Sequence, residues 1–157
     1  MEILDKVIDL AVKEAYIGIK NNHGGPFGAV IFKNKQIIAK AHNNVVKKHD
    51  PTCHGEMEVI RKACKKLKKF DLSGYELYTT GEPGGMCLIA CLWANIKKVY
   101  YSMTIADNAK INFRDNYFDN VLINRSKIAK KYLIRIKSKK CEKLFSDYKK
   151  QTNKTLY

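Results

Sequence analysis

The sequence contains little arginine, proline and tryptophan, and it has no long hydrophobic run. Its 157 residues include 30 basic side chains, of which only 4 are arginines, together with 3 prolines and 1 tryptophan. The longest nearly uncharged stretch, residues 81–96, is interrupted by Glu82 and Pro83 and is shorter than the about 20 apolar residues that span a bilayer. The acidic beginning, residues 1–5, has no basic segment before an apolar run. We therefore expect neither a membrane span nor a secretory signal.

The cysteine count argues against a disulfide-stabilised secreted protein. There are 5 cysteines, an odd number, at Cys53, Cys64, Cys87, Cys91 and Cys141. Without a signal peptide, such a set is more consistent with reduced thiols in the cytoplasm. These thiols are then candidates either for metal ligands or for small core residues.

Length and composition predict one soluble globular domain. Hydrophobic residues make up 45% of the chain and charged residues 29%, and 157 residues suffice for one domain of residues 1–157. The net charge is +15, and residues 119–157 alone hold 12 basic and 3 acidic side chains. This basic end is interpreted either as a surface that binds nucleic acid or another anion, or as a solvated lysine-rich face. The scarcity of arginine, the usual base and phosphate reader, favours the solvated face.

Hydrophobic spacing predicts alternating helices and strands. Helical spacing of apolar residues is found in four segments, and short β-type runs in five. The predicted helices are residues 2–20, 52–69, 83–94 and about 141–150, and the predicted strands are 29–32, 36–41, 75–79, 97–102 and about 133–136. Residues 43–52 and 105–118 are predicted to be loops. This order predicts an α/β fold, a three-layer α/β/α sandwich with a mixed central sheet.

A first chemically promising segment lies at the start of the second predicted helix. His54 and Glu56 are two residues apart there and are both able to project into one cleft. In such a place a histidine is suited to hold a metal while a glutamate moves protons. The alternative is a surface histidine beside an acidic residue that stabilises the helix start.

A second such segment, residues 79–87, runs from a strand into a helix. It ends at Cys87, and a thiol in the first turn of a helix is expected to ionise easily, as a metal ligand must. The alternative is an ordinary buried cysteine. The same turn exposes backbone N–H groups around Gly84 and Gly85, which suit an anion, although Glu82 would repel one.

Together the two segments resemble the signature of the zinc deaminases, His-x-Glu followed by Pro-Cys-x-x-Cys. His54 and Glu56 fit the first half, and Pro83 and Cys87 fit the second, but Gly84 stands where the first cysteine is expected. Within the cytidine deaminase-like superfamily the chain is most similar to the bacterial guanine deaminases. The similarity extends over nearly the whole chain and includes residues 24–30, 43–45, 50–52, 61–64, 93–94, 113–115 and the terminal Tyr157.

The resemblance implies hydrolytic deamination of guanine to xanthine and ammonia, a step of purine metabolism. It implies one Zn²⁺ per chain, held by His54 and Cys87 with Gly84 at the third ligand position, and Glu56 as the group that moves protons. It assigns the purine base to Asn43, Asp115 and Tyr157. It also implies a homodimer in which the basic C-terminal segment, about residues 137–157, packs on the partner subunit and brings Tyr157 to its pocket.

Gly84 leaves the metal site short of one thiolate. Cys53 and Cys91 are the nearest substitutes in sequence, but neither is well placed, so we expect weakly held zinc and low activity. Two other functions stay open. One is a tRNA adenosine deaminase, suggested by the basic tail and the shared signature. The other is a non-catalytic binder of nucleobases with the deaminase fold.

Overall fold

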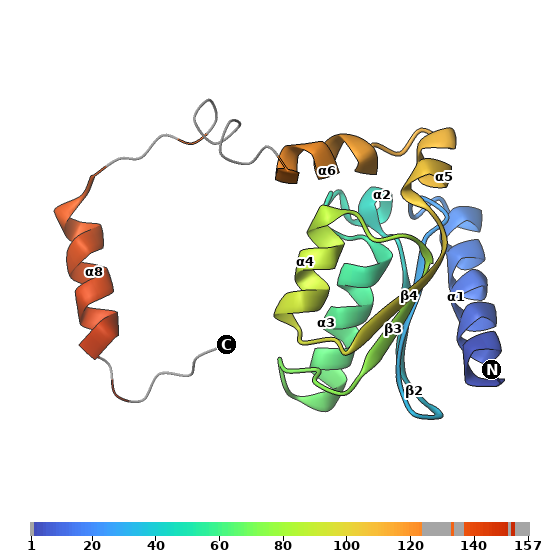
Figure 1. The fold of residues 1–157 in the computed structure, drawn as a ribbon, viewed down its shortest axis with the longest axis horizontal. Coiled ribbons are helices and arrows are strands. Elements are labelled where there is room, and N and C mark those ends of the chain that lie inside the picture. Colours follow the sequence, from blue (N-terminus) through green and yellow to red (C-terminus); the bar gives the residue numbers. More distant parts are fainter. Residues whose placement is uncertain (1, 124–132, 134–136, 151, 153–157) are drawn as a thin grey trace. The chain divides into compact units, whose positions relative to one another are not determined.

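The computed structural model describes residues 2–123, 133, 137–150 and 152 of the chain. The chain divides into two compact units, Met1–Asp119 and Asn120–Tyr157. The first unit contains the sheet and the helices packed on it, whereas the described part of the second contains α8 (Lys139–Lys150) (Figure 1). No helix among the described residues is long and apolar enough to cross a membrane.

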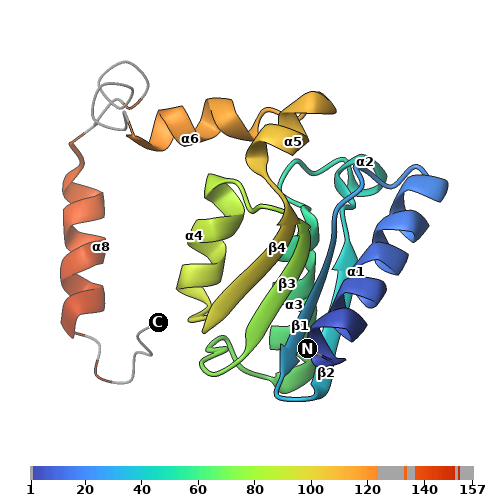
Figure 2. The ribbon, with the colours of Figure 1, turned by 45° about the vertical axis from the view of Figure 1, so that its right-hand side comes forward.

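The centre of the first unit is a four-stranded mixed sheet (Figure 2). Its strands follow the order β2-β1-β3-β4, where β1 is Gly28–Lys33, β2 is Gln36–His42, β3 is Glu76–Gly81 and β4 is Lys98–Met103. Strand β1 is antiparallel to both β2 and β3, and β3 is parallel to β4. The crossover from β3 to β4 is α4 (Gly85–Trp93), a helix of the kind that a parallel connection requires.

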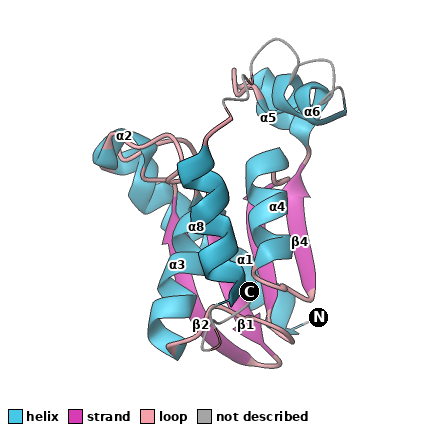
Figure 3. Ribbon diagram, turned by 90° about the vertical axis from the view of Figure 1, so that its left-hand side faces the viewer, coloured by secondary structure: helices cyan, strands magenta, loops and turns pink. Residues whose placement is uncertain are grey.

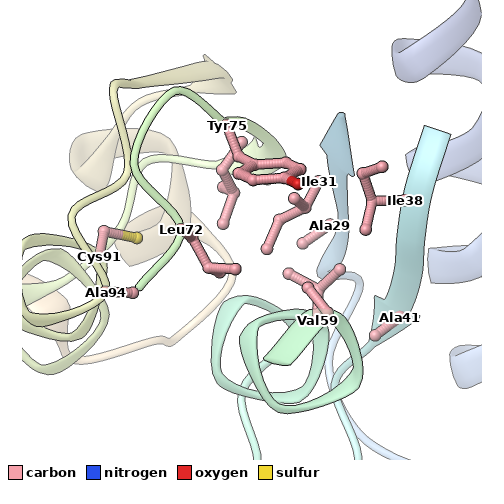
Figure 4. Close-up of a cluster of buried hydrophobic side chains, with 11 residues drawn as sticks. Ala29, Ile31, Ile38, Ala41, Val59, Leu72, Tyr75, Cys91 and Ala94 are labelled. Atoms are coloured by element: carbon pink, nitrogen blue, oxygen red, sulfur yellow. The ribbon is translucent and has the colours of Figure 1, made fainter. Parts of the chain in front are cut away.

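Helices cover both faces of the sheet, as the sequence predicts. Helix α1 (Glu2–Lys20) lies on one face, and α3 (Gly55–Leu67) and α4 lie on the other (Figures 1 and 3). Strand β1 is buried on both sides because successive side chains point to opposite faces. Val30 and Phe32 pack with α1, whereas Ala29 and Ile31 join the larger core under α3 and α4 (Figure 4). The predicted three-layer α/β/α sandwich is confirmed.

Two predicted loops contain helices. Residues 43–52 include the short helix α2 (Val45–Lys48), and residues 105–118 include α5 (Ile105–Lys110) and the beginning of α6 (Asp115–Ile123). Helix α5 starts at a capping box, in which Thr104 accepts from the N–H of Asp107 and the Asp107 carboxylate accepts from the N–H of Thr104. The predicted C-terminal helix is confirmed as α8. The predicted strand at 133–136 lies outside the described residues, apart from Leu133.

Candidate active site

Three side chains from the two predicted segments come together at the beginnings of α3 and α4. A nitrogen of His54, a carboxylate oxygen of Glu56 and the sulfur of Cys87 all lie within 4.8 Å of one another. His54 is the N-cap of α3, Glu56 is in its first turn, and Cys87 is in the first turn of α4. Only residues 82–84 separate strand β3 from α4. This short connection places the Cys87 thiol beside the Glu56 carboxylate of α3.

Glu56 is the buried acid of this cluster. It is only 5% exposed, and its Oε1 accepts a hydrogen bond of 3.2 Å from the Thr79 hydroxyl. Burial raises the pKa of the Glu56 carboxyl, and this outweighs the opposite effects of its own N–H, His54, Thr79 and Cys87. A carboxyl whose pKa is raised in a site is suited to take up and release protons.

Cys87 is a neutral thiol in this surrounding. Burial raises its pKa well above the ordinary value, and the charges of Glu56 and Asp115 raise it further. The expectation that Cys87 ionises easily is therefore wrong for the protein without a metal ion. Burial and the two carboxylates raise the pKa of the thiol by more than the helix start lowers it. A divalent cation bound here would favour the thiolate.

Gly84 stands at the N-cap of α4, and the carboxylate of Asp115 fills the space beside it. A Cβ added to Gly84 would lie 2.5 Å from Asp115 Oδ1. The other carboxylate oxygen, Oδ2, is 3.5 Å from the amide nitrogen of the buried Asn108. Asp115 begins α6, so the helices that the sequence did not predict place an acidic group beside Gly84.

Asn43 lies at the end of β2, close to the start of α3. Its N–H donates to the carbonyl of Phe27 at 2.9 Å, and a Cβ on Gly55 would be 3.7 Å from its nitrogen. The side-chain oxygen accepts from the N–H of Val45 at 3.1 Å. Its amide nitrogen makes no hydrogen bond to any described residue, so Asn43 has a donor left for a ligand.

The other sequence candidates for the site have different places. Cys53 donates to Asp50 at 3.2 Å and accepts from Arg61, and Cys91 belongs to the hydrophobic core, where burial and the Glu56 charge raise its pKa to about 12. Neither belongs to the cluster formed by His54, Glu56 and Cys87. Tyr157 lies outside the described residues.

The sequence interpretation gave no role to Thr79 or Asn108. Thr79 lies in the second segment, at the end of the predicted strand 75–79, and this position is the only signal that the sequence offers for it. The sequence predicts a loop around Asn108, although the Thr104–Asp107 spacing of a capping box indicates the helix that carries it. Asn108 also donates to the carbonyl of Glu82 at 3.4 Å, so it links α5 to the turn before α4.

A pocket of about 250 Å³ lies beside the cluster rather than on it. Phe27, Gly81 and Asn108 are among its lining residues, whereas none of the three cluster residues lines it. We place the candidate site at the cluster because the groups able to bind metal and move protons converge there. The pocket borders the same turn through Gly81 and offers apolar surface, including the Phe27 ring, which packs edge-on against Phe113.

Comparison with known proteins defines the class. Residues 1–103 match the family model of the cytidine and deoxycytidylate deaminase zinc-binding region, so the chain belongs to this family of deaminases. More particularly, it is 47% identical to the guanine deaminase of Bacillus subtilis (strain 168) over 107 residues, 68% of this chain and 69% of that protein. The solved structure of guanine deaminase from Bacillus subtilis matches it with a TM-score of 0.88 and 36% identity, covering 98% of each chain.

Two further relatives broaden this picture. The tRNA-specific adenosine deaminase of Aquifex aeolicus (strain VF5) is 48% identical over 77 residues, 49% of this chain and 51% of that protein. A solved structure in complex with 2,6-diaminopurine has a TM-score of 0.65 and 27% identity, over 69% of this chain and 61% of that chain.

The donors of the cluster are chemically suited to the zinc ion that the family implies. Imidazole nitrogen, thiolate sulfur and carboxylate oxygen are all ligands of Zn²⁺. The residue that departs from the family signature is Gly84, and the space of its missing side chain is taken by the carboxylate oxygen of Asp115.

Proposed function

We propose that this protein is a zinc-dependent enzyme that converts guanine and water into xanthine and ammonia. The observation that carries the proposal is the convergence of His54, Glu56 and Cys87 at two helix starts. The similarity to guanine deaminase along almost the whole chain supports guanine as the substrate. We place the enzyme in purine metabolism in the cytoplasm, where free thiols such as those of Cys53, Cys87 and Cys91 persist.

The protein side chains divide the work of the reaction. His54 and Cys87 would hold the zinc ion, which when bound supplies a water of lowered pKa. Glu56 takes one proton from the attacking water and delivers it to the ring nitrogen. It then takes the proton of the hydroxyl that has added to the ring carbon and delivers it to the amine, which leaves as ammonia. The Thr79 hydroxyl donates a hydrogen bond to one oxygen of the Glu56 carboxyl. The raised pKa of Glu56 suits a group that both accepts and returns a proton.

Two polar side chains would recognise the purine. The free amide nitrogen of Asn43 offers a donor to an acceptor on the purine edge. The Asp115 carboxylate offers acceptors to the ring N–H and the exocyclic amine of guanine. The solved relative that holds 2,6-diaminopurine, another aminopurine, supports a substrate of this class. We keep Tyr157 as a third contact, brought by the tail of a partner subunit.

A homodimer accounts for apolar surface that the first unit leaves exposed. Strand β4 is an edge of the sheet, and Met103 on it is exposed, as are Leu88 and Leu92 on the neighbouring α4. In α8, Leu144 and Phe145 are also exposed, which gives the C-terminal segment apolar surface for a partner.

Leu92→Glu should shift the protein toward monomer in sedimentation, whereas Ile19→Glu on α1 should not. The dimer would be contradicted if the protein is a monomer in solution and keeps full activity when residues 150–157 are removed.

The function is tested by turnover of matched substrates. Protein purified without added zinc is assayed for metal content and for ammonia release from guanine, cytosine, cytidine and adenosine. We expect guanine to react fastest. Glu56→Gln should lower this rate by about 10²-fold or more, the usual contribution of a general acid–base group, while zinc stays bound.

A tRNA adenosine deaminase is the second candidate function. The similarity to the Aquifex aeolicus protein and the basic end of the chain favour it. Deamination of adenosine in a tRNA that exceeds guanine turnover, with affinity that falls as salt rises, would establish this function in place of the first.

A further inference from the structure

The space left by the glycine at position 84 is occupied by a carboxylate, and this suggests how the metal site is completed. We propose that Asp115 supplies the third protein ligand of the metal, so that the ion is held by His54, Cys87 and Asp115. This inference rests on the proposed function, because it assumes that a zinc ion binds at the cluster. It assigns a role to Asp115 beyond contact with the substrate.

The geometry at Gly84 is the first support. The side chain of a cysteine at this position would begin at a Cβ that lies 2.5 Å from Asp115 Oδ1 and 3.3 Å from its Cγ. The carboxylate oxygen therefore sits where the missing side chain would extend. Gly84 has an ordinary φ of −67°, so backbone strain does not require glycine here. What glycine leaves is room for the acidic side chain.

The chemistry of the substitution is the second support. Carboxylate oxygen is a zinc ligand at about 2.0–2.2 Å, and it carries the same single negative charge as the thiolate it would replace. The charge around the metal is therefore unchanged.

Asn108 contacts the second oxygen of Asp115. Its amide nitrogen is 3.5 Å from Asp115 Oδ2, a long contact that allows the carboxylate to turn. Such turning is needed, because Asp115 lies outside the set of atoms within 4.8 Å of one another. Once Asp115 has turned, a hydrogen bond from Asn108 would support the ligating carboxylate.

The other groups near the metal are less suited to this role. Cys91 is part of the hydrophobic core, and Cys53 is engaged with Asp50 and Arg61. Glu56 is within the cluster, but ligation would remove the acid that the proposed reaction requires. With Oδ1 on the metal, Asp115 keeps only Oδ2 for guanine, so we expect weaker discrimination among purines than two free oxygens would give.

Metal affinity in four proteins tests the inference without reference to activity. Zn²⁺ affinity is measured by chelator competition, and Co²⁺ binding by its absorption spectrum, in the wild type, Asp115→Asn, Gly84→Cys and the double variant. Asp115→Asn should weaken Zn²⁺ binding by at least about 10-fold, the lower bound known for groups that merely support a ligand. In the Gly84→Cys background the same change should have little effect, and the sulfur-to-Co²⁺ band should be stronger because a second thiolate binds.

Asp119→Asn is the matched control, since Asp119 lies on the same helix and the change removes the same charge. Circular dichroism verifies that each variant folds. Equal Zn²⁺ affinity of the wild type and Asp115→Asn would overturn the inference. It would also be overturned if Asp115→Asn weakens Zn²⁺ binding equally in the wild type and in Gly84→Cys, or if Asp119→Asn weakens it as much as Asp115→Asn does. Guanine turnover is recorded separately, so absence of turnover in a protein whose zinc affinity depends on Asp115 would refute the proposed function and leave the ligand assignment intact.

Discussion

Gly84→Cys is the substitution that changes the metal site most directly. It adds a thiolate at the third ligand position of the family signature and displaces Asp115, because the new Cβ would lie 2.5 Å from its Oδ1. The contact is with the end of a flexible side chain, so relief requires a rotamer change that costs about 1 kcal/mol. The backbone at φ −67° accepts a cysteine.

The gain from the added thiolate should exceed this cost. Loss of groups that only support a ligand weakens metal binding or activity by about 10–100-fold. Exchanging the Asp115 carboxylate, which must turn to reach the metal, for a thiolate at the ligand position should therefore raise zinc affinity and guanine turnover by at least about 10-fold. A tenfold change corresponds to about 1.4 kcal/mol. The displaced Asp115 then has both oxygens for guanine, which adds to the expected gain in turnover.

Zinc content after purification without added metal and the rate of xanthine formation are the two readouts for this variant. Gly84→Ala is the control, because it displaces Asp115 in the same way and supplies no ligand; it should bind zinc more weakly than the wild type. If the unmodified protein already holds one tight zinc per chain and turns over as fast as Gly84→Cys, the reasoning about the missing ligand is refuted.

Two other predictions concern proton-dependent groups. Thr79→Val removes the hydrogen bond to Glu56 Oε1, so the pKa of Glu56 should rise further and the acid side of the pH–rate profile should move to higher pH, whereas Thr79→Ser should leave it in place. Burial raises the pKa of Glu14, but hydrogen bonds from His42 and Lys40 outweigh burial, and the net effect is a lowered pKa. Ionised Glu14 therefore stabilises the fold above pH 4.5, and this stability is lost as the pH falls through the folded-state pKa of Glu14. Urea unfolding should therefore show that Glu14→Gln is less stable than the wild type at pH 6, with a smaller difference at pH 3; an equal difference at both would contradict this assignment.

The regular elements and the cluster were readable from the sequence. Strand β1 is covered on both faces and gives an uninterrupted apolar run, and α1 repeats its apolar residues at helical spacing. His54, Glu56 and Cys87 could be brought together in advance because the two motifs together resemble the zinc deaminase signature. These signals are local, and the layered fold converts them into one site.

The contact between Gly84 and Asp115 could not be read in this way. The two residues are far apart in the sequence, and the chain between them includes α5, which depends on a capping box inside a polar segment. The raised pKa of Cys87 could not be read from the sequence either, because it depends on burial and on the Glu56 and Asp115 carboxylates from other elements rather than on its own helix. Both features arise from tertiary packing.

Competitive turnover of guanine, cytidine and a tRNA adenosine substrate by the zinc-loaded protein, alongside Glu56→Gln, tests the central claim most directly. The account predicts equal amounts of xanthine and ammonia from guanine, formed faster than any product of the other two substrates and lost in Glu56→Gln although zinc stays bound. Zinc-loaded wild-type protein that leaves guanine unchanged, or that prefers cytidine or the tRNA, would contradict it.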